Sequence, residues 1–239
     1  MTAIFGRDSG NPFILFGQNH LIVLGLYVVG LLLLITYRKK IIERPTVHQS
    51  MRWGLFIVLI LSEVTYQLWA AIHDLWTPDA YIPLHLCGIA GLVSAAALAT
   101  YHKKLIQLAY FIAFIPALLA LLTPELIYDY PHFRFWKFFL HHLAISWSGL
   151  FLVLTSHVTI TWKTMWTAYI SLLSYAAVIG FVLNPMLNAN YLFLARPTSA
   201  DTLLSILGSG VWYYINLCTI ALVVFASLVL FSKLFKTQE

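Results

Sequence analysis

The chain of 239 residues is 61% hydrophobic and only 10% charged. Soluble domains carry about 25% charged residues, so this composition excludes a water-soluble protein and indicates one solvated mainly by lipid. The formal net charge of +5 comes from Lys and Arg gathered in short segments, a pattern of membrane topology rather than of nucleic-acid binding. No soluble-sized insertion interrupts the apolar segments, so residues 1–239 are predicted to form a single transmembrane domain.

Seven apolar segments are long enough to cross a bilayer, because a spanning helix needs about 20 mostly apolar residues. We therefore predict an all-α, polytopic membrane bundle of seven transmembrane helices, at approximately residues 19–37, 53–73, 82–100, 105–122, 135–155, 164–187 and 210–231. The third helix is expected to start near Pro83. The longest connection, residues 188–210, is rich in aromatic and aliphatic residues and is expected to lie against the bundle or in the membrane interface.

The basic residues predict the orientation. Ten of the 14 Lys and Arg residues belong to connections or ends on one side: Arg38, Lys39, Lys40, Arg44, Arg52, Lys103, Lys104, Lys163, Lys233 and Lys236. Because the cytoplasmic side of a membrane protein carries the excess of Lys and Arg, this side is predicted to be cytoplasmic. Seven crossings then place the N-terminus outside and the C-terminus in the cytoplasm.

Polar residues are concentrated in the outer half of the predicted bundle. Cys87 and His142 each fall within roughly 10 Å of the outer end of their helix, at a rise of 1.5 Å per residue. Gln67, Asn184 and Asn216 share this depth, whereas Glu63 lies nearer the middle of the membrane. Ionisable groups in a membrane usually face a bundle interior or a cavity, so the pattern predicts a polar cavity open toward the outer face.

Cys87 is the only cysteine at this depth, and Cys218 has no ionisable neighbour in its segment. A buried cysteine is most often a small inert hydrophobe, and a nucleophilic one needs a partner that favours the thiolate. His141 and His142 offer that partner, but adjacent residues of a helix point about 100° apart, so only one can face a given point. Either histidine can instead hydrogen-bond to a neighbouring helix.

Glu63 needs a proton or a partner at this depth. It either bonds to a residue such as Gln67 or takes part in proton relay or in orienting a histidine. The residues His73, Asp74, His85, Cys87, His141 and His142 include metal-binding types, but no His-x-x-x-His pair and no Cys-x-x-Cys pair occurs. The sequence therefore predicts no metal site and no cofactor, with an intramembrane zinc hydrolase kept as an alternative.

Three basic residues of the predicted outer connections are candidates for headgroup binding. His132 and Arg134 precede the fifth helix, and Arg196 lies in the long outer connection. Together they could hold a phosphate at the level of the lipid headgroups. The alternative is that they anchor the chain at the interface and pair with Asp129 or Glu125.

Four motifs in a fixed order resemble a known family. They are Pro83-Leu-His-Leu-Cys-Gly88, Leu122-Thr-Pro-Glu125, Pro131-His-Phe-Arg-Phe135 followed by His142, and Asn190-Tyr-Leu-Phe-Leu-Ala-Arg-Pro197. Over about residues 50–230 the chain resembles the YwaF-like family of bacterial integral membrane proteins, which is similar to the eukaryotic transmembrane protein 164 family. The resemblance implies a location in the bacterial plasma membrane.

The resemblance also implies a membrane acyltransferase that moves fatty acyl groups between phospholipids through a cysteine and a histidine. Carried over, the nucleophile is Cys87 and the base is His142, with His141 one residue away. For supporting roles we expect Gln67, Asn216 or a backbone N–H of the first turn of the third helix to stabilise the oxyanion. Glu63 or Asn184 would orient the imidazole, and His85 and His141 are further supporting candidates. Hydrolysis of the acyl group by water is the variant of the same chemistry.

A second class of function also fits the sequence. A seven-helix protein without catalysis would be a transporter, a sensor or an assembly partner, although the repeat symmetry and broken helices of transporters are not evident. Under the catalytic hypothesis the expected partners are membrane phospholipids. Neither a nucleic acid nor a soluble protein partner is predicted.

Overall fold

The computed structural model describes residues 2–7, 10–196 and 204–236, and this part of the chain is helical without a strand. Its long helices are α2 (Gln18–Glu43), α3 (Pro45–Ile72), α4 (Leu86–Thr100), α5 (Lys103–Leu122), α6 (Phe133–Thr155), α7 (Trp162–Val178) and α9 (Gly210–Lys236). A π-helix, Ile179–Leu183, continues α7 into the short α8 (Asn184–Leu187). The remaining short helices are α1 (Thr2–Phe5), η2 (Tyr191–Phe193) and η3 (Ser205–Leu207).

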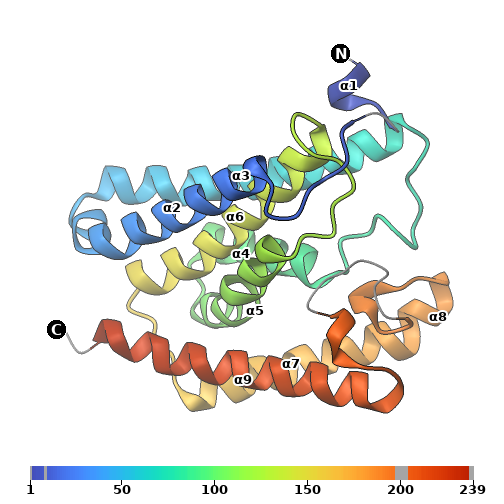
Figure 1. Cartoon of the computed structure of the whole chain (residues 1–239). Helices are drawn as coiled ribbons and strands as arrows, with labels where there is room; N and C mark the ends of the chain where they lie inside the picture. The colour runs from blue at the N-terminus through green and yellow to red at the C-terminus, as the bar shows by residue number, and fades with distance from the viewer. Residues whose placement is uncertain (1, 8–9, 197–203, 237–239) are drawn as a thin grey trace.

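The helices form three layers with α6 at the centre (Figure 1). α2 and α3 lie on one side of α6, α4 and α5 lie beside it, and α7 pairs with α9 on the far side of α5. α6 contacts α2, α3, α4 and α5, which explains why it is the most buried of the long helices. Side chains of α6 are therefore placed by packing on several sides, the arrangement that a precise site requires.

Small residues bring α6 close to α5. A Cβ atom added at Gly149 would lie 3.2 Å from the backbone nitrogen of Phe114, so the two helices approach with nothing larger than hydrogen between them. The hydroxyl of Ser146 donates to the Phe114 carbonyl (2.8 Å) and is bonded to the Tyr27 hydroxyl of α2 (3.0 Å). Small and hydroxylated residues at helix contacts are typical of membrane bundles, and here they join three helices.

The outer helices expose apolar faces, as expected of a protein surrounded by lipid. Six helical segments of the described chain are long and apolar enough to cross a membrane, counting residues 162–187 as one. Large aliphatic side chains of α2 and α3 remain exposed, among them Leu26, Leu32, Leu61 and Leu68. An apolar surface of this size is soluble only in a bilayer, so the protein is a multi-pass membrane protein.

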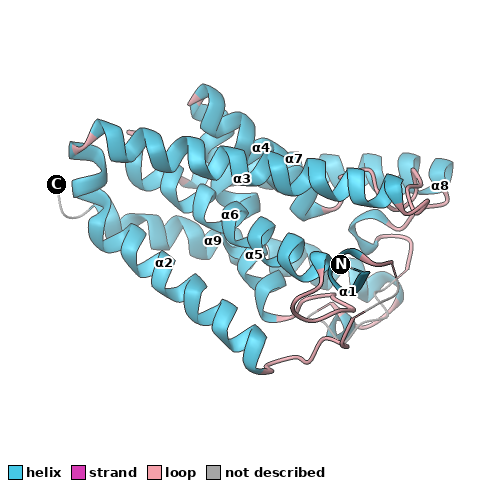
Figure 2. Ribbon diagram, turned by 90° about the horizontal axis from the view of Figure 1, so that it is seen from above, coloured by secondary structure: helices cyan, strands magenta, loops and turns pink. Residues whose placement is uncertain are grey.

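The two ends of the bundle differ. α2 begins at the end where the connections before α4 and α6 lie, and α9 ends at the other (Figures 1 and 2). At that other end Arg52 donates to the carbonyls of Leu98 and Ala99, in the last turn of α4. The Arg38 guanidinium of α2 lies 5.4 Å from the ring centroid of Phe235 in α9. The basic residues used to predict orientation thus gather at one end of the bundle.

The prediction of seven helices is confirmed, with corrections to their ends. The segment 38–52 is not a loop, because α2 continues to Glu43 and α3 begins at Pro45, leaving only Arg44 between them. Hydropathy measures the hydrocarbon-soluble part of a helix, and polar turns can continue beyond it. The predicted helix at 164–187 contains the π-helix, and residues 197–203 of the predicted long connection lie outside the described residues.

α4 is shorter than predicted, and this difference shapes the site. It begins at Leu86 rather than near Pro83 and has 15 residues, or about 22 Å at 1.5 Å per residue. The hydrocarbon core of a bilayer is about 30 Å thick, so α4 alone cannot cross it. The irregular segment 73–85 that precedes α4 completes the path across the bundle.

Irregular backbone at membrane depth must have its polar groups bonded within the protein. Side chains from α3, α7 and η2 form these hydrogen bonds to the segment before α4. Gln67 donates to the Tyr81 carbonyl (2.8 Å), Tyr175 to the Leu84 carbonyl (2.8 Å) and Tyr191 to the Pro78 carbonyl (2.5 Å).

Candidate functional site

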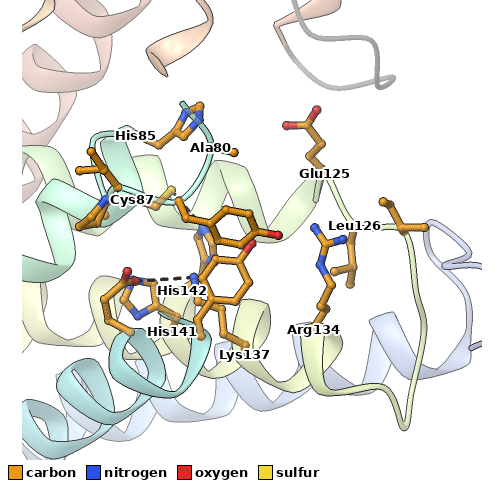
Figure 3. A pocket seen from close by; sticks show the side chains of 16 residues that line it. Ala80, His85, Cys87, Glu125, Leu126, Arg134, Lys137, His141 and His142 are labelled. Carbon is orange, nitrogen blue, oxygen red and sulfur yellow. Dashed lines mark hydrogen bonds and ion pairs between the residues drawn. The ribbon is translucent and has the colours of Figure 1, made fainter. Parts of the chain in front are cut away.

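A cavity of about 520 Å³ lies where the irregular segment meets α3 and α6 (Figure 3). Its lining comes from α3, the segment before α4, the first turn of α4, the connection before α6, and α6. The lining residues are Glu63, Tyr66, Ala80, Tyr81, Ile82, Pro83, His85, Cys87, Gly88, Glu125, Leu126, Ile127, Arg134, Lys137, His141 and His142. The volume is in the range of small-molecule sites.

Cys87 lies in the first turn of α4, where a tight turn holds it. The helix begins with the bond from the Ile89 N–H to the His85 carbonyl (3.1 Å). At Gly88 an added Cβ would lie 2.5 Å from the carbonyl oxygen of Pro83, so only glycine allows the chain to fold back this closely. The thiol of Cys87 is partly exposed and lines the cavity.

His142 of α6 lies against this thiol. Its Nε2 is 3.0 Å from the Sγ of Cys87, and its Nδ1 is 2.7 Å from the carbonyl oxygen of Phe138. A carbonyl can only accept, so Nδ1 carries the proton, and in a neutral imidazole Nε2 is then the acceptor. The thiol therefore donates to a histidine that is oriented by the backbone of its own helix.

His141 faces the other way, toward α3. Its Nδ1 lies 2.6 Å from the Ser62 hydroxyl, which donates to the Leu59 carbonyl (3.0 Å). Its Nε2 is buried without a hydrogen-bond partner among the described residues, beside Gly91, where an added Cβ would lie 3.1 Å from it. His141 contributes to the cavity wall, but its bonded nitrogen serves the contact between α6 and α3.

Glu63 is bound at the side of the cavity rather than left alone. Its Oε1 accepts from the Gln67 amide at 2.6 Å, and its Oε2 lies 3.8 Å from the ammonium of Lys137. The Gln67 carbonyl oxygen in turn accepts from Trp76 (2.7 Å). Neither Glu63 nor Gln67 is hydrogen-bonded to His142, which takes its orientation from Phe138.

His85 links the cavity to the segment after α8. Its ring lies 5.2 Å from the ring centroids of both Tyr191 and Phe193, and its Nδ1 is 3.4 Å from the Leu192 backbone nitrogen. Asn184 holds this segment by two bonds to the Tyr191 backbone (2.8 and 3.0 Å). As predicted, the described part of the connection after α8 packs against the bundle, since Tyr191 is completely buried.

The structure separates the three residues predicted to bind a headgroup. His132 is completely buried. It caps α6 by accepting from the Arg134 backbone (3.1 Å), and its Nε2 donates to the Gly6 carbonyl (2.9 Å). Arg134 lines the cavity, whereas Arg196 is exposed and outside it. Asn184 and Asn216 also lie outside the cavity, and Asn216 donates to the Leu207 carbonyl (3.0 Å).

Two site residues were not singled out by the sequence. Lys137 is not among the ten basic residues that predict the cytoplasmic side, yet it lines the cavity between Arg134 and His141 on α6. Lys137 lies three residues after Arg134 and four before His141, and this spacing indicated that all three share one face of the helix. Ser62, the partner of His141, precedes Glu63 directly and had no distinguishing pattern.

Metal ligation finds no support in the arrangement. Across the described residues, no three His, Cys, Asp or Glu side chains are grouped closely enough to hold a metal ion. Within the cavity, His142 already uses both ring nitrogens. The donor set thus does not fit the histidine-rich centre that the zinc-hydrolase alternative requires.

The bundle and its Cys–His pair define a polytopic helical membrane protein with a thiol at the edge of a cavity. The chain belongs to the TMEM164 family, whose model it matches over residues 15–229. This match confirms the predicted relationship to the transmembrane protein 164 family and extends it toward the N-terminus. No curated protein and no solved structure gives a significant match to the chain.

Proposed function

We propose that the protein transfers fatty acyl groups of membrane phospholipids, or hydrolyses them, through a thioester on Cys87 with His142 as the base. The single observation that carries the proposal is the 3.0 Å contact between Cys87 Sγ and His142 Nε2 at a cavity wall. A nucleophile within hydrogen-bond reach of a base that a third group orients is the signature of covalent catalysis. Here the third group is the Phe138 carbonyl.

The first half of the reaction forms the acyl-enzyme. The Cys87 proton moves to Nε2 of His142 as Sγ attacks the ester carbonyl carbon. The tetrahedral intermediate then collapses, the bond from carbon to the glycerol oxygen breaks, and the imidazolium gives its proton to that oxygen. The products are a thioester on Cys87, a lysolipid and neutral His142.

The second half releases the acyl group. A hydroxyl of an acceptor lysolipid, or water, loses its proton to His142 Nε2 while its oxygen attacks the thioester carbonyl. The carbon–sulfur bond breaks, and the proton returns to the Cys87 sulfur. His142 serves as the base and then as the acid in both halves, because it contacts the sulfur directly.

The start of α4 offers donors for the oxyanion. The first N–H groups of a helix have no carbonyl partner within it, and Cys87 and Gly88 are the second and third residues of α4. Backbone N–H groups aimed at a developing oxyanion commonly contribute about 10²–10³ in rate. The absence of a side chain at Gly88 keeps this turn accessible from the cavity.

The distribution of charge supports a location in the cell membrane with the Cys87 end facing outward. The basic residues near Arg38 and Arg52 lie at the opposite end of the bundle, and the positive end of a membrane protein faces the cytoplasm. The cavity would then receive lipids of the outer leaflet. Labelling of single-cysteine variants at each end with a membrane-impermeant maleimide tests this orientation.

The test of the chemistry is intact-mass analysis of the purified protein after incubation with phospholipid. We expect an acyl adduct on the wild type that hydroxylamine removes, and no adduct on Cys87→Ser. Cys218→Ser is the matched control, since Cys218 lies in α9 with no histidine contact among the described residues, and it should react like the wild type. An equal adduct on Cys87→Ser, or lipid turnover that survives this substitution, would rule the nucleophile out.

A further inference from the structure

Two cations of α6 line the same cavity as the Cys87–His142 pair. Arg134 and Lys137 are three residues apart and therefore lie on one face of the helix, and Figure 3 shows both beside the cavity. We propose that they form an anion subsite that binds the phosphate group of the acyl donor. The assignment rests on the proposed acyl transfer and adds the recognition of a group that the Cys–His pair does not contact.

The ammonium group of Lys137 is held in place but not hydrogen-bonded. It lies 3.8 Å from Glu63 Oε2 and 4.1 Å from the centroid of the Tyr66 ring. The distance to Glu63 exceeds the roughly 3.2 Å of an N–H···O bond, and the contact with the Tyr66 ring is a cation–π interaction. The group is mostly buried, with 17% of the side chain exposed. The ion pair with Glu63 thus leaves the ammonium without a hydrogen-bond acceptor at bonding distance among the described residues, and mostly buried donors of this kind favour a polar ligand.

Arg134 adds a planar set of donors beside them. Its side chain is half-buried at the cavity wall, and within the described residues its guanidinium forms no hydrogen bond or ion pair. A guanidinium binds phosphate through two parallel N–H···O bonds, and an ammonium complements it as a point charge. The pair therefore matches the several oxygens of a phosphate better than a single carbonyl.

The carboxylates nearby do not remove the preference of Arg134 and Lys137 for an anion. Glu63 and Glu125 line the same cavity, so the attraction for an anion comes from the unfilled donors rather than from net charge. Glu63 is engaged by Gln67 at 2.6 Å, which fixes its carboxylate on one side of Lys137. Arg134 also stands in the first turn of α6, where the helix dipole favours a negative ligand.

The spacing along α6 agrees with the shape of a glycerolipid. Lys137 precedes His142 by five residues and Arg134 precedes it by eight, or about 7 and 12 Å along the helix axis. A phosphate at these cations and an ester carbonyl at Cys87 would be separated by a distance that a glycerol unit spans. Arg134 lies nearer the end of the helix, where a lipid headgroup would enter.

The experiment compares two acyl donors with identical chains, dioleoylphosphatidylcholine and dioleoylglycerol, in mixed micelles. The readout is the half-saturating donor concentration for adduct formation on Cys87. The wild type should prefer the phosphorylated donor. Arg134→Gln and Lys137→Gln should each reduce this preference by about tenfold or more, since a charge-assisted hydrogen bond contributes at least that much. Arg134→Lys should retain part of it.

Lys163→Gln is the matched control, because Lys163 is an exposed cation at the opposite end of the bundle. It should leave the donor preference unchanged. Inorganic phosphate distinguishes a lipid phosphate from a free one. If phosphatidylcholine shows no advantage, but phosphate slows the reaction of dioleoylglycerol in the wild type and not in the Arg134→Gln/Lys137→Gln double variant, the subsite binds free phosphate.

A second arm separates this subsite from the acyl transfer itself. Cys87→Ala protein is mixed with a diether phosphatidylcholine, which has no ester, and with the matching dialkylglycerol, and native mass spectrometry measures retention. Preferential retention of the phospholipid that Arg134→Gln abolishes would support the subsite even if no adduct ever forms. Adducts that form equally from both donors, with no effect of Arg134→Gln or Lys137→Gln on their ratio, would overturn the subsite and leave acyl transfer standing.

Discussion

The two sides of α6 carry adjacent histidines in different surroundings. On the side facing α4, His142 meets the Cys87 thiol at the cavity. On the side facing α3, His141 meets the Ser62 hydroxyl in the contact between helices. Both are buried and both are bonded through Nδ1. What distinguishes them is what Nε2 faces: the thiol of Cys87 in one case, and the backbone of Gly91 in the other.

This comparison teaches that burial and bonding alone do not mark a catalytic histidine. A histidine in a membrane helix commonly joins two helices, and His141 fits that description. His142 is also bonded through Nδ1, but its Nε2 faces the thiol of Cys87. The difference predicts a graded set of effects when either side is disturbed.

The largest effect is expected from His142→Gln. Removing the base should slow formation of the acyl adduct on Cys87 by about 10²–10⁴-fold, the usual contribution of general base catalysis. His141→Gln is the matched change one residue away. Single-turnover adduct formation followed by intact mass measures both, and equal losses in the two variants would contradict the division of roles.

Gly88→Ala should have the next largest effect. The new Cβ would lie 2.5 Å from the Pro83 carbonyl, so the turn that holds Cys87 must shift. A misplacement of about 1 Å can cost roughly 10²-fold in rate. Gly25→Ala is the control, because nothing lies within 4 Å of its added Cβ. The same rate assay checks it, and an unimpaired Gly88→Ala would show that the turn does not position the thiol.

Ser62→Ala disturbs the other side of α6. It leaves Nδ1 of His141 without its partner, which should destabilise the folded protein by about 1–3 kcal/mol. Adduct formation should fall by less than about tenfold, because the Cys87–His142 contact is untouched. Denaturation in detergent measures the first quantity and intact mass the second. A large loss of the adduct rate with unchanged stability would indicate that His141 takes part in the catalytic step.

Gly91→Ala should have the smallest effect. Its Cβ would approach His141 to 3.0 Å, which a shift of a few tenths of an ångström can relieve. We expect a destabilisation of about 1 kcal/mol, the lower end of the range for overpacking, and a nearly unchanged adduct rate. A strong loss of adduct in this variant would indicate that His141 and Cys87 are coupled through α4.

The seven-helix fold was predictable because it follows from hydropathy, which changes little with tertiary context. The exception was the start of α4. Residues 82–85 were predicted to be helical, but the close approach of Gly88 to Pro83 keeps them irregular. Side-chain bonds to the carbonyls of Pro78, Tyr81 and Leu84 hold the whole segment before α4 in this conformation. The side chains that form these bonds belong to other segments of the chain, so no local sequence pattern predicts them.

The candidate site was predictable in part. Cys87 and His142 were named from their depth and from the motifs, and the structure brings them together. Which histidine faces the thiol depends on the rotation of α6 about its axis, which packing against four helices decides. The bond from His132 to the Gly6 carbonyl also depends on a partner far away in the chain, whereas Asn184 bonds to the backbone of Tyr191, only seven residues further on.

The π-helix at Ile179–Leu183 has a consequence for how the cavity is kept in shape. A π turn is an α-helix widened by one extra residue. Deleting one residue there would return the helix to regular winding and turn Asn184 by about 100° around its axis. The side-chain amide of Asn184 would then lose its two hydrogen bonds to the Tyr191 backbone. Tyr191 would shift as a result, and its hydroxyl would no longer donate to the Pro78 carbonyl. The extra residue of the π-helix thus helps to hold in place the irregular segment before α4, which forms one wall of the cavity.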